Sequence, residues 1–180
     1  IDTFLRQEEY IGNPTSDSVG IYIGIPFCPT RCSYCSFTSN QVEAKEIERY
    51  IIALNKEIKF VSESMKIKKL YPESIYIGGG TPTTLTAYQL DKLITHIEHS
   101  FDYKKLKEFT VEAGRPDTIT KDKLDVIKAH GINRISINPQ SMKDRTLELI
   151  GRSHSANDIR KAFELAKNYN FESINVDVIA

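Results

Sequence analysis

Short apolar segments rich in β-branched residues alternate along the chain with longer segments of helical periodicity. The apolar segments cover residues 19–25, 74–77, 109–113, 132–137 and 172–179. The segments with apolar residues at intervals of three and four lie near 42–65, 86–97, 121–129, 143–150 and 156–169. Such alternation is typical of parallel β-strands joined by right-handed helical crossovers, in an open sheet or a barrel. The sequence therefore predicts an α/β fold.

Polar residues and glycines lie on or directly after the predicted strands. In chain order they are the cysteine segment after residues 19–25, the run Gly78-Gly79-Gly80-Thr81, Glu112, Asn138 with Gln140, and Asp177. In a β/α barrel the carboxyl ends of the strands face one mouth, where active sites form. This placement favours a barrel over an open sheet, with these residues gathered at its mouth.

All three cysteines lie within eight positions, in the sequence Cys28-Pro-Thr-Arg-Cys32-Ser-Tyr-Cys35. Thiolates are soft metal ligands, and this spacing lets one loop turn three sulfurs inward onto a compact cluster. Three ligands are one too few for a closed site, so one metal of the cluster stays open to a small molecule. We predict that Cys28, Cys32 and Cys35 hold an iron–sulfur cluster.

The cysteines have two other interpretations, a zinc site and a disulfide framework. A structural zinc site closes with four Cys or His ligands, usually as two separated pairs, and the histidine nearest in sequence to the cysteines is His96. A disulfide framework requires an even number of cysteines in a secreted chain, whereas this chain has three. Both interpretations explain the spacing less well than a cluster does.

Composition and charge indicate an ordinary globular protein. The 180 residues are 40% hydrophobic, as in an ordinary globular core, and 24 basic residues balance 24 acidic ones. No excess charge points to nucleic acid or an anionic membrane, and no apolar run approaches the ~20 residues of a membrane span. The polar residues 1–18 are interpreted as an N-terminal arm or linker before a core domain at 19–180. A cytoplasmic setting, where thiolates stay reduced, is expected.

Three motifs carry a resemblance to a known family. They are Tyr22-Ile-Gly-Ile-Pro-Phe-Cys28, Gly78-Gly-Gly-Thr-Pro-Thr83, and Arg134-Ile-Ser-Ile137 leading to Gln140. Together with the cysteine spacing, they resemble the oxygen-independent coproporphyrinogen dehydrogenases of the radical S-adenosylmethionine (SAM) superfamily, nearest to the branch called HemZ. The resemblance spans residues 19–180. It implies an incomplete β/α barrel of about six units, of which this chain, as a C-terminally truncated fragment, holds about the first five strands.

The resemblance also implies cofactors and roles. A [4Fe-4S] cluster on the three cysteines would bind SAM at its open iron. Tyr22 would lie near the SAM sulfonium, both as a catalytic and as a cofactor-binding residue. The other implied SAM contacts are Gly79, Gly80 and Thr81 near its amino group, with Glu112, Gln140, Arg152 and Asp177 completing the site.

Each of these roles has a plainer alternative. The glycine run could be only a turn, although glycines let the backbone approach a ligand closely, and a side chain at Gly79 is expected to block SAM without harming the fold. Glu112 and Asp177, on apolar strands, need partners, which could be a ligand or a structural salt bridge. Gln140 and Arg152 could be ordinary surface residues. The histidines His96, His99 and His130, on or at the ends of predicted helices, are expected to be solvated.

The chain departs from the family pattern at several positions. Gly24 stands where much of the family has histidine, and Phe37 stands where well-studied coproporphyrinogen dehydrogenases have a fourth cysteine. The spacing from Glu112 to the following Pro116 is one residue longer than usual, and Pro139 unusually precedes Gln140. These departures bear on which substrate the chain would use, and they leave the expected binding of the cofactors in place.

The function implied by the resemblance is that of a radical SAM oxidoreductase. An electron donor would reduce the cluster, and a 5′-deoxyadenosyl radical derived from SAM would abstract hydrogen from the propionates of coproporphyrinogen III. These side chains would lose carbon dioxide and become the vinyl groups of protoporphyrinogen IX in haem biosynthesis. Two alternatives remain: a haem-binding chaperone, whose relatives also carry Phe two residues after the third cysteine, and another radical SAM reaction on a tetrapyrrole.

Overall fold

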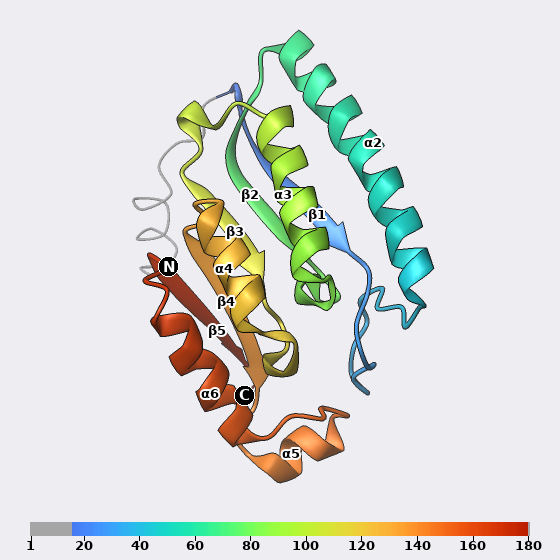
Figure 1. Ribbon diagram of the computed structural model, residues 1–180, viewed down its shortest axis with the longest axis vertical. Helices are drawn as coiled ribbons and strands as arrows, with labels where there is room; N and C mark the ends of the chain where they lie inside the picture. Colours follow the sequence, from blue (N-terminus) through green and yellow to red (C-terminus); the bar gives the residue numbers. More distant parts are fainter. Residues whose placement is uncertain (1–15, 180) are drawn as a thin grey trace, which may run out of the picture.

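The computed structural model describes residues 16–179 as a five-stranded parallel sheet with helices packed against it (Figure 1). The strands are β1 (Ser18–Ile25), β2 (Tyr71–Gly79), β3 (Glu108–Glu112), β4 (Arg134–Gln140) and β5 (Ser173–Val178). They pair in the order of the sequence, so β1 and β5 form the two edges of the described sheet. Most of the predicted arm at residues 1–18 lies outside the described residues.

Five helices and three short 3₁₀ turns connect the strands. The helices are α2 (Ala44–Lys68), α3 (Ala87–Ser100), α4 (Lys121–Ala129), α5 (Asp144–Leu149) and α6 (Ala156–Lys167). The 3₁₀ turns are η1 (Pro82–Thr84), η2 (Tyr103–Lys105) and η3 (Pro116–Thr118). No helix in residues 16–179 combines the length and the apolar character needed to cross a membrane.

Two strands are longer than the sequence predicts, because pairing with a neighbour extends them. β2 begins at Tyr71, which pairs with Ser18 across a register shift in β1. β4 continues to Gln140, which pairs with Val178 of β5 after a second irregularity. Local hydrophobicity does not predict either extension, because each one depends on a hydrogen-bonding partner on the neighbouring strand.

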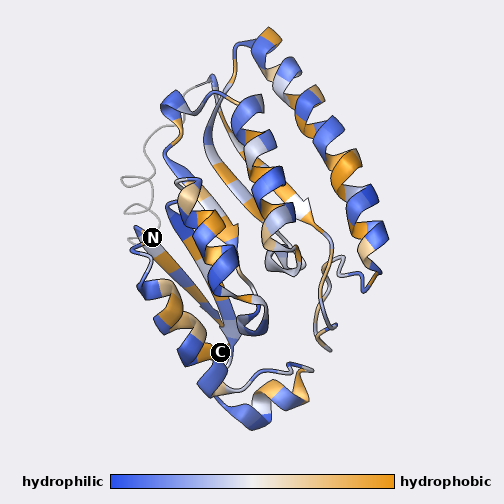
Figure 2. Ribbon diagram, in the orientation of Figure 1, coloured by the Kyte–Doolittle hydropathy of each residue, from blue (hydrophilic) through white to orange (hydrophobic). Residues whose placement is uncertain are grey.

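The helices cover one face of the sheet, and the hydrophobic core lies between the two layers. Alternate residues of the strands supply the sheet side of this core: Ile23, Ile25, Ile75, Ile77, Phe109, Val111, Ile135 and Ile137. The inner stripes of α2 and α3 pack on β1 to β3, and residues of α4 and α6 pack on β3 and β4. Figure 2 shows the matching alternation of hydrophobic and hydrophilic residues along the elements. The period of two along a strand thus determines which side chains the helices cover.

The opposite face of the sheet carries small and polar residues. Gly24 of β1 pairs with Gly78 of β2, and Glu112 of β3 pairs with Ser136 of β4, which in turn pairs with Asn175 of β5. These residues occupy the positions between the core residues of the same strands. The pleat therefore turns polar side chains of β3, β4 and β5 toward one space, beside the glycines of β1 and β2.

The cap of α3 agrees with the prediction from the sequence, but the environments of two histidines do not. Thr86 and Gln89 form the predicted capping box at the start of α3. His99 is exposed as expected. The expectation that His96 and His130 are solvated is wrong: the His96 ring lies 2.9 Å from the carbonyl oxygen of Asn55, and the His130 side chain is only 14% exposed between two carboxylates. Helix packing, which sequence position alone does not reveal, encloses both rings.

Candidate functional site

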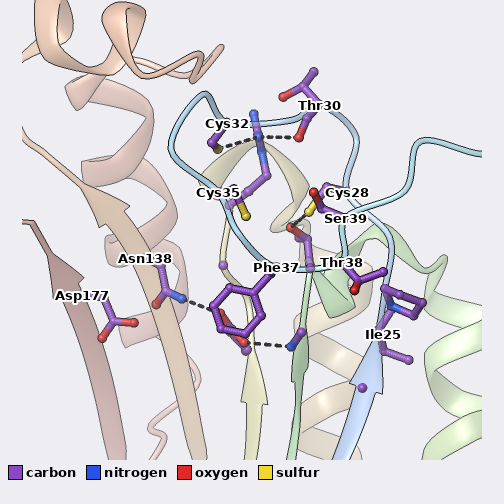
Figure 3. Close-up of a pocket in the computed structure, with 18 of the residues that line it drawn as sticks. Ile25, Cys28, Thr30, Cys32, Cys35, Phe37, Thr38, Ser39, Asn138 and Asp177 are labelled. Carbon is purple, nitrogen blue, oxygen red and sulfur yellow. Dashed lines mark hydrogen bonds between the residues drawn. The ribbon is translucent and has the colours of Figure 1, made fainter.

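A pocket of about 840 Å³ opens at the carboxyl ends of the strands, beside the cysteine loop (Figure 3). It is lined by every residue that was predicted to bind the cluster or SAM: Tyr22, Cys28, Cys32, Cys35, Gly79, Gly80, Thr81, Glu112, Gln140, Arg152 and Asp177. Apart from Arg152, which lies between α5 and α6, the predicted residues come from all five strands or the loops that follow them. The structure thus brings together residues that are up to 155 positions apart, as the strand-end argument predicts.

The cysteine loop leaves β1 and returns to it through backbone hydrogen bonds. The amide of Asn40 donates to the carbonyl of Pro26 at 2.8 Å, and the amide of Cys28 donates to the carbonyl of Asn40 at 3.1 Å. Phe27, between them, is buried and anchors this junction in the core. The residues between the two ends form a closed loop whose three thiols lie around one end of the pocket.

The glycine run approaches the start of this loop too closely for side chains. Gly79 has φ +114°, and a Cβ there would lie 2.9 Å from the carbonyl oxygen of Ile25. A Cβ on Gly80 would lie 2.6 Å from the carbonyl oxygen of Phe27 and 3.0 Å from the sulfur of Cys28. The expectation that Gly79 tolerates a side chain without harm to the fold is therefore wrong, because the clash is with the backbone of β1. The run is more than a turn: it packs directly against the cysteine loop.

The three cysteines are free thiols with different exposure. Cys32 is buried, while Cys28 and Cys35 are partly exposed to the pocket. The Cys28 sulfur lies 3.2 Å from the Thr81 hydroxyl oxygen. Burial raises the pKa of the Cys28 thiol, and the hydrogen bond to Thr81 opposes this. A soft metal site is the environment that would hold such thiols as thiolates.

The arrangement of these ligands fits a cluster better than a single ion. Within residues 16–179 no three His, Cys, Asp or Glu side chains converge closely enough to hold one metal ion. In a cubane each cysteine binds a different iron, so its sulfur ligands lie farther apart than those of one zinc ion. Three thiols from one loop, facing a pocket beside a glycine cradle, match the donor set that a [4Fe-4S] cluster with an open iron requires.

Glu112 lies across the pocket from the cysteines and is held by two donors. Its Oε2 accepts a hydrogen bond of 3.3 Å from the amide of Gly79, and its Oε1 accepts one of 2.7 Å from the side chain of Asn138. Burial raises the pKa of Glu112 to about 7, and the charge of Asp177 adds to this. The two hydrogen bonds and the charge of Arg152 act in the opposite direction. A cationic ligand in the pocket would favour the ionised carboxylate.

A chain of side-chain hydrogen bonds extends from Glu112 across the polar face of the sheet. The Ser136 hydroxyl donates to the Asn138 side-chain oxygen at 2.8 Å, and the Asn175 amide donates to both Ser136 and Asp177. Neither Glu112 nor Asp177 forms an ion pair within 4.0 Å among the described residues. A structural salt bridge therefore does not explain these carboxylates.

Arg152 is engaged with backbone rather than free at the surface. Its Nη1 donates to the carbonyls of Gly114 and Asn138, both at 3.1 Å, and its Nη2 donates to the Tyr34 hydroxyl at 3.1 Å. Through Tyr34 it connects the cysteine loop to the ends of β3 and β4. Gln140, at the end of β4, has a positive φ of 68°. Both side chains line the pocket, but Arg152 has fewer unused donors than the sequence suggests.

Two tyrosines extend the pocket wall along β1 and β2. Tyr22 is 60% exposed and stacks on Tyr76, with ring centroids 5.8 Å apart and an angle of 10° between the planes. Burial, followed by the charge of Glu112, raises the pKa of Tyr76 to about 12, so its hydroxyl stays protonated at neutral pH. The pair offers a flat aromatic surface next to the carboxylate.

Sequence reasoning missed two residues of the site or left them without a role. Asn138 is noted above only for its place after a strand, yet it is the main side-chain partner of Glu112. Arg115 is 2% exposed and lines the pocket at the cysteine loop. The strand-end rule that selected Glu112 also applies to Arg115, three residues later, and would have found it.

Comparison with known sequences identifies one superfamily. The family model described as "Radical SAM superfamily" matches residues 22–180. The oxygen-independent coproporphyrinogen-III oxidase-like protein HemZ of Bacillus subtilis is 43% identical over 166 residues, which cover 91% of this chain and 33% of HemZ. The heme chaperone HemW of B. subtilis is 38% identical over 159 residues, covering 88% of this chain and 41% of HemW.

A solved structure of a radical SAM enzyme has a fold similar to that of this chain. The coproporphyrinogen III oxidase HemN of Escherichia coli, described as a radical SAM enzyme, matches 99% of this chain with a TM-score of 0.80 and 26% identity. The match covers 40% of HemN, so the chain spans about a third to two fifths of the length of these relatives. The predicted fold, an incomplete β/α barrel of about five strands, is confirmed.

Proposed function

The chain belongs to the radical SAM superfamily, whose cofactors are a [4Fe-4S] cluster and SAM, and on this basis we propose that it acts as a radical SAM oxidoreductase on coproporphyrinogen III. The proposed reaction is the oxygen-independent decarboxylation of two propionates to the vinyl groups of protoporphyrinogen IX. Each propionate gives up one hydrogen atom, one electron and one carbon dioxide. The reaction therefore needs an electron donor for the cluster and an acceptor for the electron that the substrate loses. We also propose a cytoplasmic location, because the cysteine thiols stay reduced there.

One observation carries this proposal. Three thiols and a doubly hydrogen-bonded carboxylate, Glu112, line the same pocket at the strand ends, separated by glycines that leave the backbone accessible. Bound together, the cluster and SAM supply a carbon-centred radical that abstracts hydrogen. The chain supplies the ligands and the orientation.

Individual roles follow from the chemistry of the side chains. We assign the cluster to Cys28, Cys32 and Cys35. Glu112 accepts a hydrogen bond from the ammonium group or a ribose hydroxyl of SAM. The amide of Gly79 and the side chain of Asn138, which donate to its carboxylate, aim it into the pocket. The remaining proposed SAM contacts are the backbone of Gly79 and Gly80, the Thr81 hydroxyl, and the side chains of Tyr22, Gln140, Arg152 and Asp177.

Tyr22 is the residue proposed to lie closest to the reacting part of SAM. Its ring is stacked on Tyr76 and stands at the pocket edge, so a bound sulfonium would lie against an aromatic face. Cations are attracted to the negative face of such rings. Tyr22 thereby orients the ligand without exchanging a proton, since burial raises the pKa of its hydroxyl further above neutrality.

The test is product analysis under anaerobic conditions. The chain, reconstituted with iron and sulfide, is incubated with SAM, dithionite and coproporphyrinogen III, and products are measured by mass spectrometry, with E. coli HemN as positive control. We expect the 180-residue chain to bind both cofactors without decarboxylation, because it spans only 33% of the length of its HemZ relative and a pocket open to solvent exposes the radical to side reactions with reductant and buffer solutes. A form extended to the length of its HemZ relative is expected to release two carbon dioxides. Cofactor binding by the extended form with no decarboxylated product would contradict the proposal.

A second candidate function, haem binding without turnover, is favoured by a specific residue. Phe37 lies two residues after the third cysteine, is 63% exposed and lines the pocket, where it offers apolar surface to a planar ligand. HemW, a protein named as a heme chaperone, is 38% identical to the chain. Titration with haem, followed by absorbance, separates the two functions. Stoichiometric haem binding together with absence of decarboxylation in the extended form would favour the chaperone, or a third reaction on the tetrapyrrole if a different product forms.

A further inference from the structure

Arg115 places a buried positive charge against the cysteine loop. It follows β3 by three residues and is 2% exposed. Its Nη1 lies 3.8 Å from the sulfur of Cys32 and 3.3 Å from the carbonyl oxygen of Thr30, to which it donates. In Figure 3 these two contacts are the dashed lines that end at Cys32 and Thr30. A cation is thus in direct contact with a proposed cluster ligand.

The other side of the guanidinium is held by two further segments. Its Nε donates to Asp117 in η3 at 3.2 Å, and its Nη2 donates to Ser153, between α5 and α6, at 3.1 Å. Arg115 therefore connects three parts of the chain: the cysteine loop, the turn after β3 and the loop before α6. The planar fork of arginine suits such a junction, because its donors point in fixed directions.

A buried guanidinium is costly unless its surroundings compensate it. Asp117 supplies one negative charge. Burial alone would raise the pKa of Asp117, but its contact with His154 and the charge of Arg115 outweigh this and lower the pKa to about 2. Asp117 is therefore ionised throughout the neutral range, and Arg115 sits between two negative groups whenever Cys32 is a thiolate. Without a thiolate in the site, the side of Arg115 that faces the loop has only a carbonyl and a neutral sulfur.

We propose that Arg115 is a positioning residue that fixes Cys32 for cluster binding and that its charge favours the reduced state of the cluster, with Asp117 as the opposing charge. The proposal rests on the assignment of the three cysteines as cluster ligands and is independent of the tetrapyrrole reaction. Reduction adds one negative charge to the cluster, and a nearby buried cation attracts that charge more strongly than the same cation would in water. Asp117, on the far side of Arg115, weakens this effect without removing it.

The proposal predicts shifts of opposite sign for two substitutions. Arg115→Gln removes the cation and is expected to lower the reduction potential of the reconstituted cluster by about 59 mV. For a one-electron couple this shift is a tenfold change in the ratio of reduced to oxidised cluster. Asp117→Asn removes the opposing charge and is expected to raise the potential. Arg134→Gln, a partly exposed arginine paired with Glu108, is the matched control and is expected to leave it unchanged. The potential is measured on the full chain by an EPR-monitored redox titration.

A second measurement tests the positioning without the cluster. The amides of Ser33 and Cys35 are hydrogen-bonded, to the carbonyls of Ile150 and Cys32. In the chain without iron, Arg115→Gln is expected to speed hydrogen exchange of residues 28–35 relative to Arg134→Gln. Equal exchange in the two variants would overturn the positioning role, and equal potentials in Arg115→Gln and Asp117→Asn would overturn the electrostatic one. Failure of the unmodified chain to take up iron would contradict the cluster assignment instead, while the exchange measurement would still decide the positioning role.

Discussion

The side-chain amide of Asn138 on β4 donates a hydrogen bond of 2.7 Å to Glu112 at the end of β3. The amide of Gly79 on β2 donates to the other oxygen of the same carboxylate. Because the three strands are parallel neighbours whose carboxyl ends meet at one edge, the carboxylate is held from both sides and aimed into the pocket. A carboxylate that is fixed before a ligand arrives loses little entropy on binding.

Removal of the Asn138 donor should weaken binding of SAM. Asn138→Ala leaves one oxygen of a buried carboxylate without its partner, which costs about 1–3 kcal/mol. We expect SAM affinity, measured by isothermal titration on cluster-loaded protein, to fall by about 5- to 150-fold. Asn168→Ala, at an exposed asparagine that ends α6 away from the pocket, is the matched control. Equal affinity in the two variants would contradict the assignment of Glu112 to the SAM site.

Binding of SAM should depend on pH through Glu112. Its pKa of about 7, raised mainly by burial, means that the carboxyl is largely protonated in mildly acidic solution. A cationic ligand needs the ionised form, so affinity is expected to rise as pH increases from 6 to 8 and then to level off. Glu112→Gln should bind weakly with no such rise over this range. A pH-independent affinity for the unmodified chain would remove Glu112 from contact with the cationic part of SAM.

The same pKa predicts the stability of the chain without ligand. The folded-state pKa of about 7 lies above the ordinary value of 4.5, so the folded state holds the proton more tightly than the unfolded one. The stabilisation is fully present below pH about 4.5 and is lost as pH rises to about 7; its upper limit is about 3 kcal/mol. Urea unfolding between pH 4.5 and 8 is expected to show this loss relative to Glu112→Gln. If the unmodified chain instead gained stability relative to Glu112→Gln as pH rises, the sign would be reversed and the burial of Glu112 contradicted.

Gly80 should be essential to the junction of β2 and the cysteine loop. A Cβ at Gly80 would meet the carbonyl oxygen of Phe27, which accepts a hydrogen bond from the amide of Thr81. Gly80→Ala is expected to destabilise the chain by about 1–3 kcal/mol in urea unfolding and to lower iron incorporation, because the backbone around Cys28 must shift. Gly24→Ala is the control, since its Cβ would meet only the Tyr22 ring at 3.7 Å, an ordinary contact. Similar losses in both variants would show that any side chain at this face disturbs the sheet.

Each cysteine should be required for the cluster. After anaerobic reconstitution, the single variants Cys28→Ala, Cys32→Ala and Cys35→Ala are expected to hold little of the iron and sulfide that the unmodified chain holds. Ser36→Ala, an exposed position in the same loop, is the control and should reconstitute normally. Full iron content in any one cysteine variant would remove that residue from the site. One zinc ion per chain with no iron uptake would replace the cluster by a zinc site.

The sequence alone determined the elements of this protein and most members of its site. Strands such as 19–25 and the capping box at Thr86 were predictable because hydrophobic period and helix caps depend on residues a few positions apart. The site residues were predictable for a related reason. In parallel β/α units every strand ends at the same edge, so Gly79, Glu112 and Asp177 had to meet once the strands were recognised.

Only the tertiary structure decided which partners those residues have and which charges are buried. The contact of Arg115 with Thr30 joins residues 85 positions apart, and the partners of His130 lie on a different helix. The sequence predicts Gly79 as a ligand contact, yet its lack of a side chain is also required by the backbone of β1. The cost of burying a charge, and the groups that offset it, depend on which distant segments pack around it, and no local pattern in the sequence records that arrangement.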